Sequence, residues 1–128
     1  MNTKIEKHVI RLHNSEHDAH LIFHATPTRA QEFYDHQWYI TQSETVIGVP
    51  IKEECYEMLI LTTELIKEEG YDGLYLYCKR TNKRTGKESN TELIRLYSNV
   101  NKIIDSDTIF DHIKEYDEHG EITPIIKQ

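Results

Sequence analysis

The sequence predicts an α+β fold, in which a mostly antiparallel sheet packs against one long helix and one shorter C-terminal helix. Alternating apolar and polar residues indicate two β-hairpins, one at the N-terminus and one over residues 74–97. Residues 51–69 and 107–118 instead repeat apolar side chains every three or four positions, which is typical of a helix with one buried face. No repeat or linker divides the chain, so we expect one domain over residues 1–128.

The N-terminal hairpin is predicted to join strands over residues 5–14 and 19–25. The turn-forming residues 15–18 lie between them. In the second strand, alternation would place Leu21 and Phe23 on one face and the two histidines of the strand on the other.

The residues after this hairpin are less regular. Residues 29–36 fit either a short helix or a loop, and Trp38 to Thr41 fit a short strand by their β-propensity. The apolar run from Val46 to Val49 follows. We then expect the long helix to begin after Pro50, which suits a first helical turn because its missing N–H needs no partner there.

The expected long helix has a clear end at Gly70, which can adopt the left-handed conformation cheaply. Cys55 would lie on its buried face. The strand starting at Leu74 is the clearest in the chain, and it is predicted to pair with a strand that ends at Tyr97.

The C-terminal part is predicted to be helical and then extended. Ser106 is expected to cap the helix over 107–118, and Gly120 to end it. In the tail that follows, Pro124 would restrict any strand to the edge of a sheet.

Composition limits the kinds of protein that this chain could be. Its net charge of −7 argues against general nucleic-acid binding. No apolar run reaches the length of a membrane span. Cys55 and Cys78 are the two cysteines, and we expect reduced thiols in a cytoplasmic protein. Heavy use of Ile, Lys, Glu and Tyr indicates an AT-rich genome, such as that of a low-GC bacterium or its phage.

A cluster of basic residues in the 74–97 hairpin is the main candidate site, here called the basic hairpin tip. It holds five of the 15 basic residues within nine positions, and tyrosines flank it. Arginine can bind phosphate or carboxylate oxygens and tyrosine can stack on bases, so the tip suits a protein partner or a nucleotide-derived ligand. The candidate binding residues are Lys79, Arg80, Lys83, Arg84, Lys87, Tyr75, Tyr77 and Tyr97.

The sequence favours a small binding or regulatory protein without enzymatic activity. It contains no P-loop, no Ser-His-Asp arrangement and no glycine-rich phosphate cradle, and no cofactor is expected. An inhibitor, anti-defence or immunity-type factor encoded by a phage or mobile element fits this description. We expect a protein partner, no membrane contact and no nucleic-acid contact other than through the basic hairpin tip. The sequence leaves a homo-oligomer open.

Histidines are concentrated at the start of the chain, where six of the eight lie within the first 36 residues. His20 and His24 would share a strand face about 13 Å apart, too far to hold one ion. No HExxH or CxxC pattern is present, so we expect no metal site and interpret these histidines as exposed residues of a polar sheet face.

Three scattered residues resemble the His–Tyr–Glu set of small ADP-ribosyltransferases. His24 lies at the end of an early strand, Tyr39 lies in a later one, and a Gly-Tyr-Asp-Gly turn starts at Gly70. The resemblance implies, as the alternative function, an enzyme in which His24 and Tyr39 hold the nicotinamide riboside and Glu92 stabilises the developing oxocarbenium charge.

Overall fold

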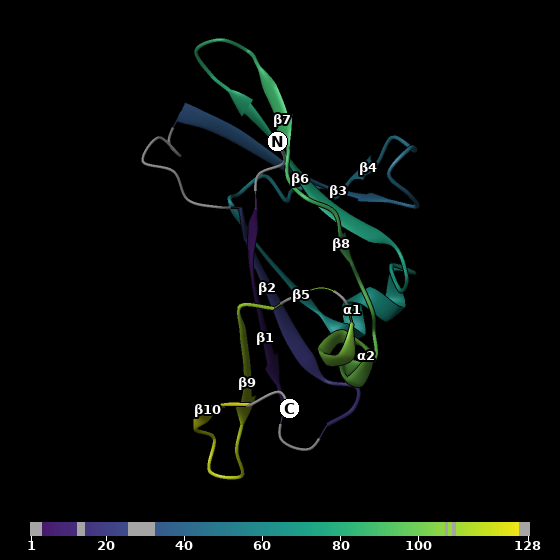
Figure 1. Cartoon of the computed structure of the whole chain (residues 1–128), viewed down its shortest axis with the longest axis vertical. Helices are drawn as coiled ribbons and strands as arrows, with labels where there is room; N and C mark the ends of the chain where they lie inside the picture. The colour runs from purple at the N-terminus through teal and green to yellow at the C-terminus, as the bar shows by residue number, and fades with distance from the viewer. Residues whose placement is uncertain (1–3, 13–14, 26–32, 107, 109, 126–128) are drawn as a thin grey trace.

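The computed structural model describes residues 4–12, 15–25, 33–106, 108 and 110–125. Over these residues the chain forms two five-stranded sheets and two short helices (Figure 1). The fold is therefore mainly β, and the predicted α+β class with one long helix is wrong. The elements are β1 (Ile5–Arg11), β2 (Ala19–Ala25), β3 (Tyr34–Thr41), β4 (Val49–Pro50), β5 (Met58–Thr62), α1 (Thr63–Glu68), β6 (Tyr75–Asn82), β7 (Glu88–Asn90), β8 (Ile94–Arg95), α2 (Val100–Asp105), β9 (His112–Tyr116) and β10 (Ile122–Pro124).

Sheet I has the strand order β10-β9-β1-β2-β5 and occupies the lower part of Figure 1. The predicted N-terminal hairpin is present, with Ile5 opposite Ala25 and Arg11 opposite Ala19. Strand β9 pairs with β1 in parallel, and β10 forms the sheet edge, where Pro124 needs no ladder partner for its nitrogen.

Sheet II has the order β4-β3-β6-β7, and β8 pairs with β6 further along the same edge as β7. The hairpin predicted over residues 74–97 is present as β6 and its two return strands. Strand β3 covers Tyr34–Thr41, longer than the predicted strand, and the helix considered for residues 29–36 lies partly outside the described residues.

One hydrophobic core fills the space between the two sheets and the helices. Alternation directs every second residue of each strand inward, including Phe23 on sheet I and Trp38 on sheet II, both fully buried. The helices add Ile66 from α1 and Val100 from α2. The two sheets and the two helices thus contribute to the same core.

Residues 51–57, expected to be helical, instead join the sheets. The Ile51 N–H donates to the Trp38 carbonyl at 2.9 Å, and the indole Nε1 of Trp38 donates to the Tyr56 carbonyl at 2.7 Å. The Ala25 N–H then donates to the Glu57 carbonyl at 2.9 Å. The segment thus passes from the edge of β3 to the edge of β2.

The long helix predicted over residues 51–69 is replaced by this link, strand β5 and the six-residue helix α1. In β5, Leu59 and Leu61 are buried while their neighbours are not, which is the period of a strand. Helix α1 begins only after Thr62, whose hydroxyl accepts the Leu65 N–H at 3.0 Å. Gly70 does end this helix, with a φ of 73°.

The helix predicted over residues 107–118 is also wrong. Ser106 caps the C-terminal end of α2 rather than the start of a helix. Residues 112–116 form β9, because they supply backbone partners to the open edge of β1. Gly120 lies in the turn to β10, where the Asp117 carboxylate accepts the N–H groups of His119 and Glu121.

Candidate functional site

The outer surface of sheet II carries a stacked tyrosine pair, which we call the tyrosine face. Tyr39 and Tyr77 are direct cross-strand neighbours on β3 and β6, and their rings lie 5.2 Å apart at an angle of 6°. They point away from the core because their neighbours Trp38 and Cys78 point into it. The Lys79 ammonium lies 5.1 Å from the centre of the Tyr39 ring.

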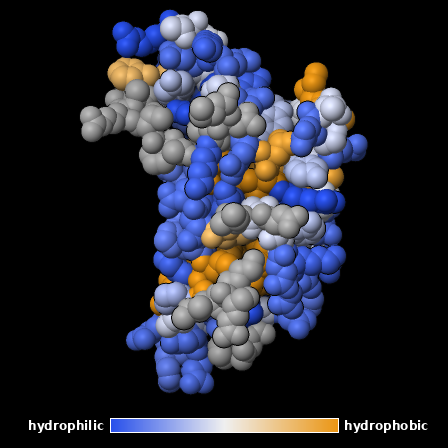
Figure 2. Space-filling view, in the orientation of Figure 1, coloured by the Kyte–Doolittle hydropathy of each residue, from blue (hydrophilic) through white to orange (hydrophobic). Residues whose placement is uncertain are grey.

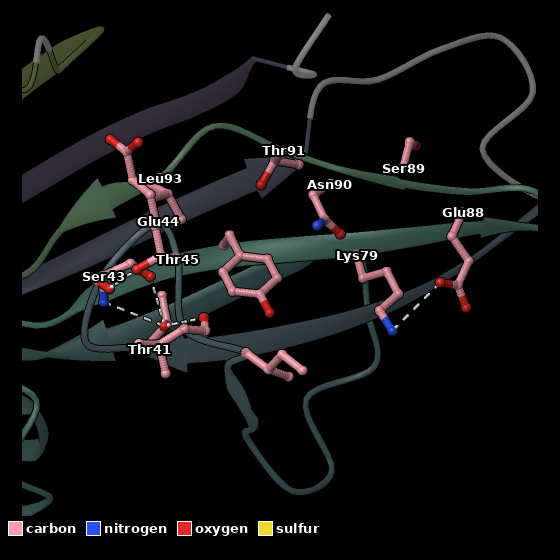
Figure 3. Close-up of a pocket in the computed structure, with 13 residues that line it drawn as sticks. Thr41, Ser43, Glu44, Thr45, Lys79, Glu88, Ser89, Asn90, Thr91 and Leu93 are labelled. Atoms are coloured by element: carbon pink, nitrogen blue, oxygen red, sulfur yellow. Dashed lines mark hydrogen bonds and ion pairs between the residues drawn. The ribbon is translucent and has the colours of Figure 1, made fainter.

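A shallow groove of about 780 Å³ lies beside this pair (Figure 3). Its walls come from the β3–β4 loop and from β7, Tyr77 also lines it, and Figure 3 shows Lys79 pointing toward Glu88. The Lys79 and Glu88 side chains lie 3.8 Å apart. Most of the lining is uncharged, and its charged members are two carboxylates, Glu44 and Glu88, and one lysine, Lys79.

The β3–β4 loop, residues 42–48, holds apolar side chains out beside the groove. Ile47 is 91% exposed, and the neighbouring Val49, the first residue of β4, is 70% exposed. Figure 2 shows apolar atoms protruding on the side of the molecule where β4 lies in Figure 1. The loop is nevertheless ordered by the Thr41 hydroxyl, which donates to the carbonyls of Ser43 and Val46.

Gly48 allows the loop to approach the tyrosine pair. Its N–H donates to the Tyr77 hydroxyl at 3.3 Å. A Cβ at this position would lie 2.7 Å from that hydroxyl oxygen and 3.0 Å from the Tyr39 Cβ. A side chain would therefore displace either the tyrosine or the loop.

The charge of Lys79 is favoured by its surroundings. Its hydrogen bond with the Tyr39 hydroxyl is the main reason that its pKa is raised above the ordinary value, and the nearby Glu88 charge adds to the effect. The lysine is therefore cationic at neutral pH and is oriented along the tyrosine face.

The basic hairpin tip does not form one surface. Lys83, Arg84 and Lys87 are exposed in the β6–β7 turn. Arg80 points inward, is only 4% exposed, and lies 4.3 Å from the centre of the Tyr34 ring. Lys79 faces the groove, so the five cations divide among three environments.

The remaining two predicted tyrosines belong to a second groove of about 540 Å³. There the Arg95 guanidinium lies 5.5 Å from the Tyr75 ring and 5.7 Å from the Tyr97 ring. Lys7 and Glu92 also line this groove, and their side chains form an ion pair at 2.6 Å.

The structure does not bring the three residues of the ADP-ribosyltransferase resemblance together. His24 is on the outer face of sheet I, beside Glu57 at 3.8 Å. Tyr39 is on the outer face of sheet II. Glu92 contacts Lys7, whose side chain points to the inner side of sheet I. Neither of the two grooves is lined by two of these residues, so the described geometry adds no support to that hypothesis.

Sequence reasoning missed the β3–β4 loop as part of the site. The run Val46-Ile47-Gly48-Val49 has the composition of a buried strand, and that composition hides its exposure. The useful signal was Gly48, which allows close backbone approach to an aromatic side chain.

Comparisons of the chain with protein-family models, with curated proteins and with solved structures found no match. The structure defines the class of the fold: a mainly β domain with two sheets around one core. No helix among the described residues is long and apolar enough to cross a membrane.

Proposed function

We propose that this chain is a non-enzymatic binding protein, and that the tyrosine face with the adjoining β3–β4 loop contacts a protein partner. The observation that carries the proposal is Ile47, which is 91% exposed on an ordered loop beside the Tyr39–Tyr77 pair. An exposed aliphatic side chain on its own needs no explanation. Here Val46 and Val49 are exposed with it, so three apolar side chains are exposed within four positions of the chain.

The chemistry of the surface fits a protein partner. Tyrosine is enriched in protein interfaces because it offers a large, rigid contact area together with a hydroxyl group. The stacked Tyr39–Tyr77 pair would form the centre of the contact. Polar hydroxyl and amide side chains, among them Thr45, Ser89 and Asn90, surround it as a rim.

The charge balance argues against a nucleotide-derived ligand at this groove. Proteins that hold phosphates present a positive channel. This groove has one lysine, Lys79, against Glu44 and Glu88. A polypeptide, with its own amide groups and few charges, matches a mixed and mostly neutral lining better than a phosphate does.

The proposal keeps the broader expectation of a small cytoplasmic regulator, such as an inhibitor, an anti-defence factor or an immunity-type factor of a phage or mobile element. Such proteins act by occupying a partner's surface and need no catalytic group. The tyrosine face supplies the contact surface for this role.

Photo-crosslinking tests the proposal. A photoreactive phenylalanine analogue replaces Ile47 in one variant and Ile122, an exposed residue of edge strand β10, in a matched control. After irradiation in the cells that naturally express the chain, we expect one defined adduct from position 47 and none from position 122. Adding Tyr77→Ala to the first variant should abolish the adduct.

Two results would contradict the proposal. One is the same adducts from both positions, which would indicate nonspecific contact. The other is an adduct from position 47 that Tyr77→Ala leaves unchanged. An adduct at twice the mass of the chain would identify the partner as a second copy of the chain and would support contact through this surface.

A further inference from the structure

The outer face of sheet I gathers histidines from three strands. Cross-strand register places His8 beside His112 and Glu6 beside His24. Their side chains point away from the core because Lys7, Val9 and the other alternate residues point into it. His20 is on the same face, opposite Ile10.

Three of these outward groups form a compact cluster. The His8 Nε2 and Glu6 Oε1 atoms lie 2.7 Å apart. The His8 and His112 rings stack with their centres 4.5 Å apart at an angle of 28°. One ligand atom from each of the three side chains lies within 4.8 Å of the others, and no other group of this kind occurs among the residues that the structure describes.

The backbone fixes the position of this cluster. The Lys7 N–H donates to the Asp111 carboxylate at 2.7 Å, and the Asp111 N–H donates to the Lys7 carbonyl at 2.8 Å. These two bonds hold the start of β9 against the middle of β1. His112, the next residue, is thereby held beside His8, although 103 positions separate Asp111 from His8 in the sequence.

We propose that Glu6, His8 and His112 bind a divalent transition metal ion, with Zn²⁺ as the best match. Two imidazoles and one carboxylate are ligands that Zn²⁺ accepts at about 2.0–2.2 Å. Ligands at that distance from a tetrahedral ion are about 3.4 Å from one another. Small rotations of the three side chains reach this spacing, since their ligand atoms already lie within 4.8 Å.

The site would keep one coordination position open. Three protein ligands leave the fourth position of a tetrahedral ion to water or another small ligand. His112 is exposed, so solvent reaches this position without any movement of the fold. Imidazole ligands favour zinc over magnesium or calcium, which prefer oxygen ligands.

The ion would add a link between β1 and β9, which already pair in parallel and are joined by the Arg11–Glu115 ion pair at 2.7 Å. Strand β9 and its partner β10 form the edge of sheet I, and every residue of β10 is exposed. Metal bonds from His8 on β1 and His112 on β9 would hold the β9–β10 hairpin to β1. The β9–β10 hairpin would then open less often when zinc is bound.

Zinc titration of the full chain without a histidine tag tests the site. Using competition with a chromogenic chelator, we expect one Zn²⁺ per chain, and we expect His8→Ala and His112→Ala each to weaken binding at least about tenfold. Glu6→Gln should weaken it less, because the amide oxygen remains a ligand. The matched control is His20→Ala, on the same face outside the cluster, which should change the affinity by less than about twofold.

Hydrogen exchange supplies the second readout. Zn²⁺ should slow exchange of the β9 amides in the wild type and in His20→Ala, and should have no effect in His112→Ala. The proposal is overturned by an absence of saturable zinc binding, by a loss in His20→Ala equal to that in His112→Ala, or by bound zinc that leaves β9 exchange unchanged. His112 is exposed, so its replacement should not disturb folding, which circular dichroism would verify.

Discussion

The outer faces of the two sheets have the same construction but different chemistry. Sheet I presents imidazoles and a carboxylate, which are metal ligands, around His8 and His112. Sheet II presents stacked phenol rings, an ammonium and aliphatic side chains around Tyr77 and Ile47. In both sheets alternate residues are used by the shared core, so only the outward set is free to differ. Strand register therefore determines what each face can bind, because it decides which outward residues become neighbours.

The outer faces of both sheets depend on the core that the sheets share. The largest loss of stability that we predict tests this dependence. Trp38 is fully buried, and its indole donates to the Tyr56 carbonyl in the segment that joins the sheets. We expect Trp38→Ala to lower the free energy of unfolding by about 3–5 kcal/mol. Urea denaturation measures the loss. The matched control is Tyr56→Ala, whose exposed side chain should contribute less than about 0.5 kcal/mol; equal losses would contradict the assigned core.

Breaking the ion pair between the sheets is expected to cause the next largest loss of stability. Lys7, 4% exposed on sheet I, donates to Glu92, which follows β7 of sheet II. Glu92→Ala removes the carboxylate partner of a buried ammonium, which keeps its bond to the Ile5 carbonyl, and we expect a loss of about 1–3 kcal/mol in the free energy of unfolding. Lys7→Met should cost less, because it removes the buried charge.

A double-mutant cycle sharpens this prediction. In the Lys7→Met background, Glu92→Ala should have almost no further effect on the free energy of unfolding. Additive losses would show that the two side chains act separately. Glu92 would then lose the structural role that we assign to it, and the role implied by the ADP-ribosyltransferase resemblance would again be open to it.

Gly48 allows the sheet II face to be altered without altering sheet I. Gly48→Ala places a Cβ within 3.0 Å of both tyrosines. The Tyr77 ring can move, so we expect a stability loss below about 1 kcal/mol but a clear change in the near-ultraviolet circular dichroism of tyrosine. The control Gln42→Ala, exposed in the same loop, should change neither signal. An unchanged tyrosine spectrum in Gly48→Ala would contradict the close packing of loop and ring.

His36 provides a pH test of the inner face of sheet II. Burial, and after it the Arg80 charge, lowers its pKa below 6.5. Above pH 6.5 the residue is neutral in both folded and unfolded chains. As pH falls below 6.5 the unfolded chain binds a proton that the folded chain resists, so stability is lost.

We expect the free energy of unfolding to fall more between about pH 7 and about pH 5 in the wild type than in His36→Gln. The other histidines are the same in both proteins, so their contributions cancel in the difference. Parallel stability curves for the two proteins would show that His36 is not held neutral by burial.

The last prediction concerns the reactivity of the two thiols, which distinguishes a side chain in the core from one on the surface. Burial raises the pKa of Cys78 to about 12, whereas Cys55 is exposed in the joining segment. A thiol reagent should modify Cys55 alone in the native chain and both cysteines in urea. Modification of Cys78 at an equal rate would place it outside the core.

The β1–β2 hairpin and the β6 strand could be predicted from the sequence because their signals are local. Alternation over Leu21 and Phe23, and turn formers over 15–18, specify pairing between neighbours in the chain. Gly70 also ends a helix as predicted, since the ability to adopt a positive φ is a property of glycine itself.

The long helix over residues 51–69 could not be corrected from local pattern alone. Its residues Leu59 and Leu61 fit a two-residue period as well as a helical one. The strand conformation is selected by β2, whose residues Phe23 and Leu21 pair with them from 36 and 40 positions away. The same is true of β9, whose partner β1 is about one hundred positions away.

The candidate sites were predicted less well than the strands. Lys79 and Tyr77 line the same groove. Arg80 points inward, because alternation along β6 places it on the same side as the buried Cys78. The Glu6–His8–His112 cluster was missed because His112 was assigned to a helix, and His20 and His24 were the histidines considered.

The independence of the two outer faces is tested most directly by measuring both kinds of binding in two variants. Zinc affinity and crosslinking from position 47 are recorded in Tyr77→Ala and in His112→Ala. We predict that Tyr77→Ala loses the crosslink and keeps its zinc affinity, and that His112→Ala does the reverse. If either variant loses both activities while remaining folded, the separation of the two faces is contradicted.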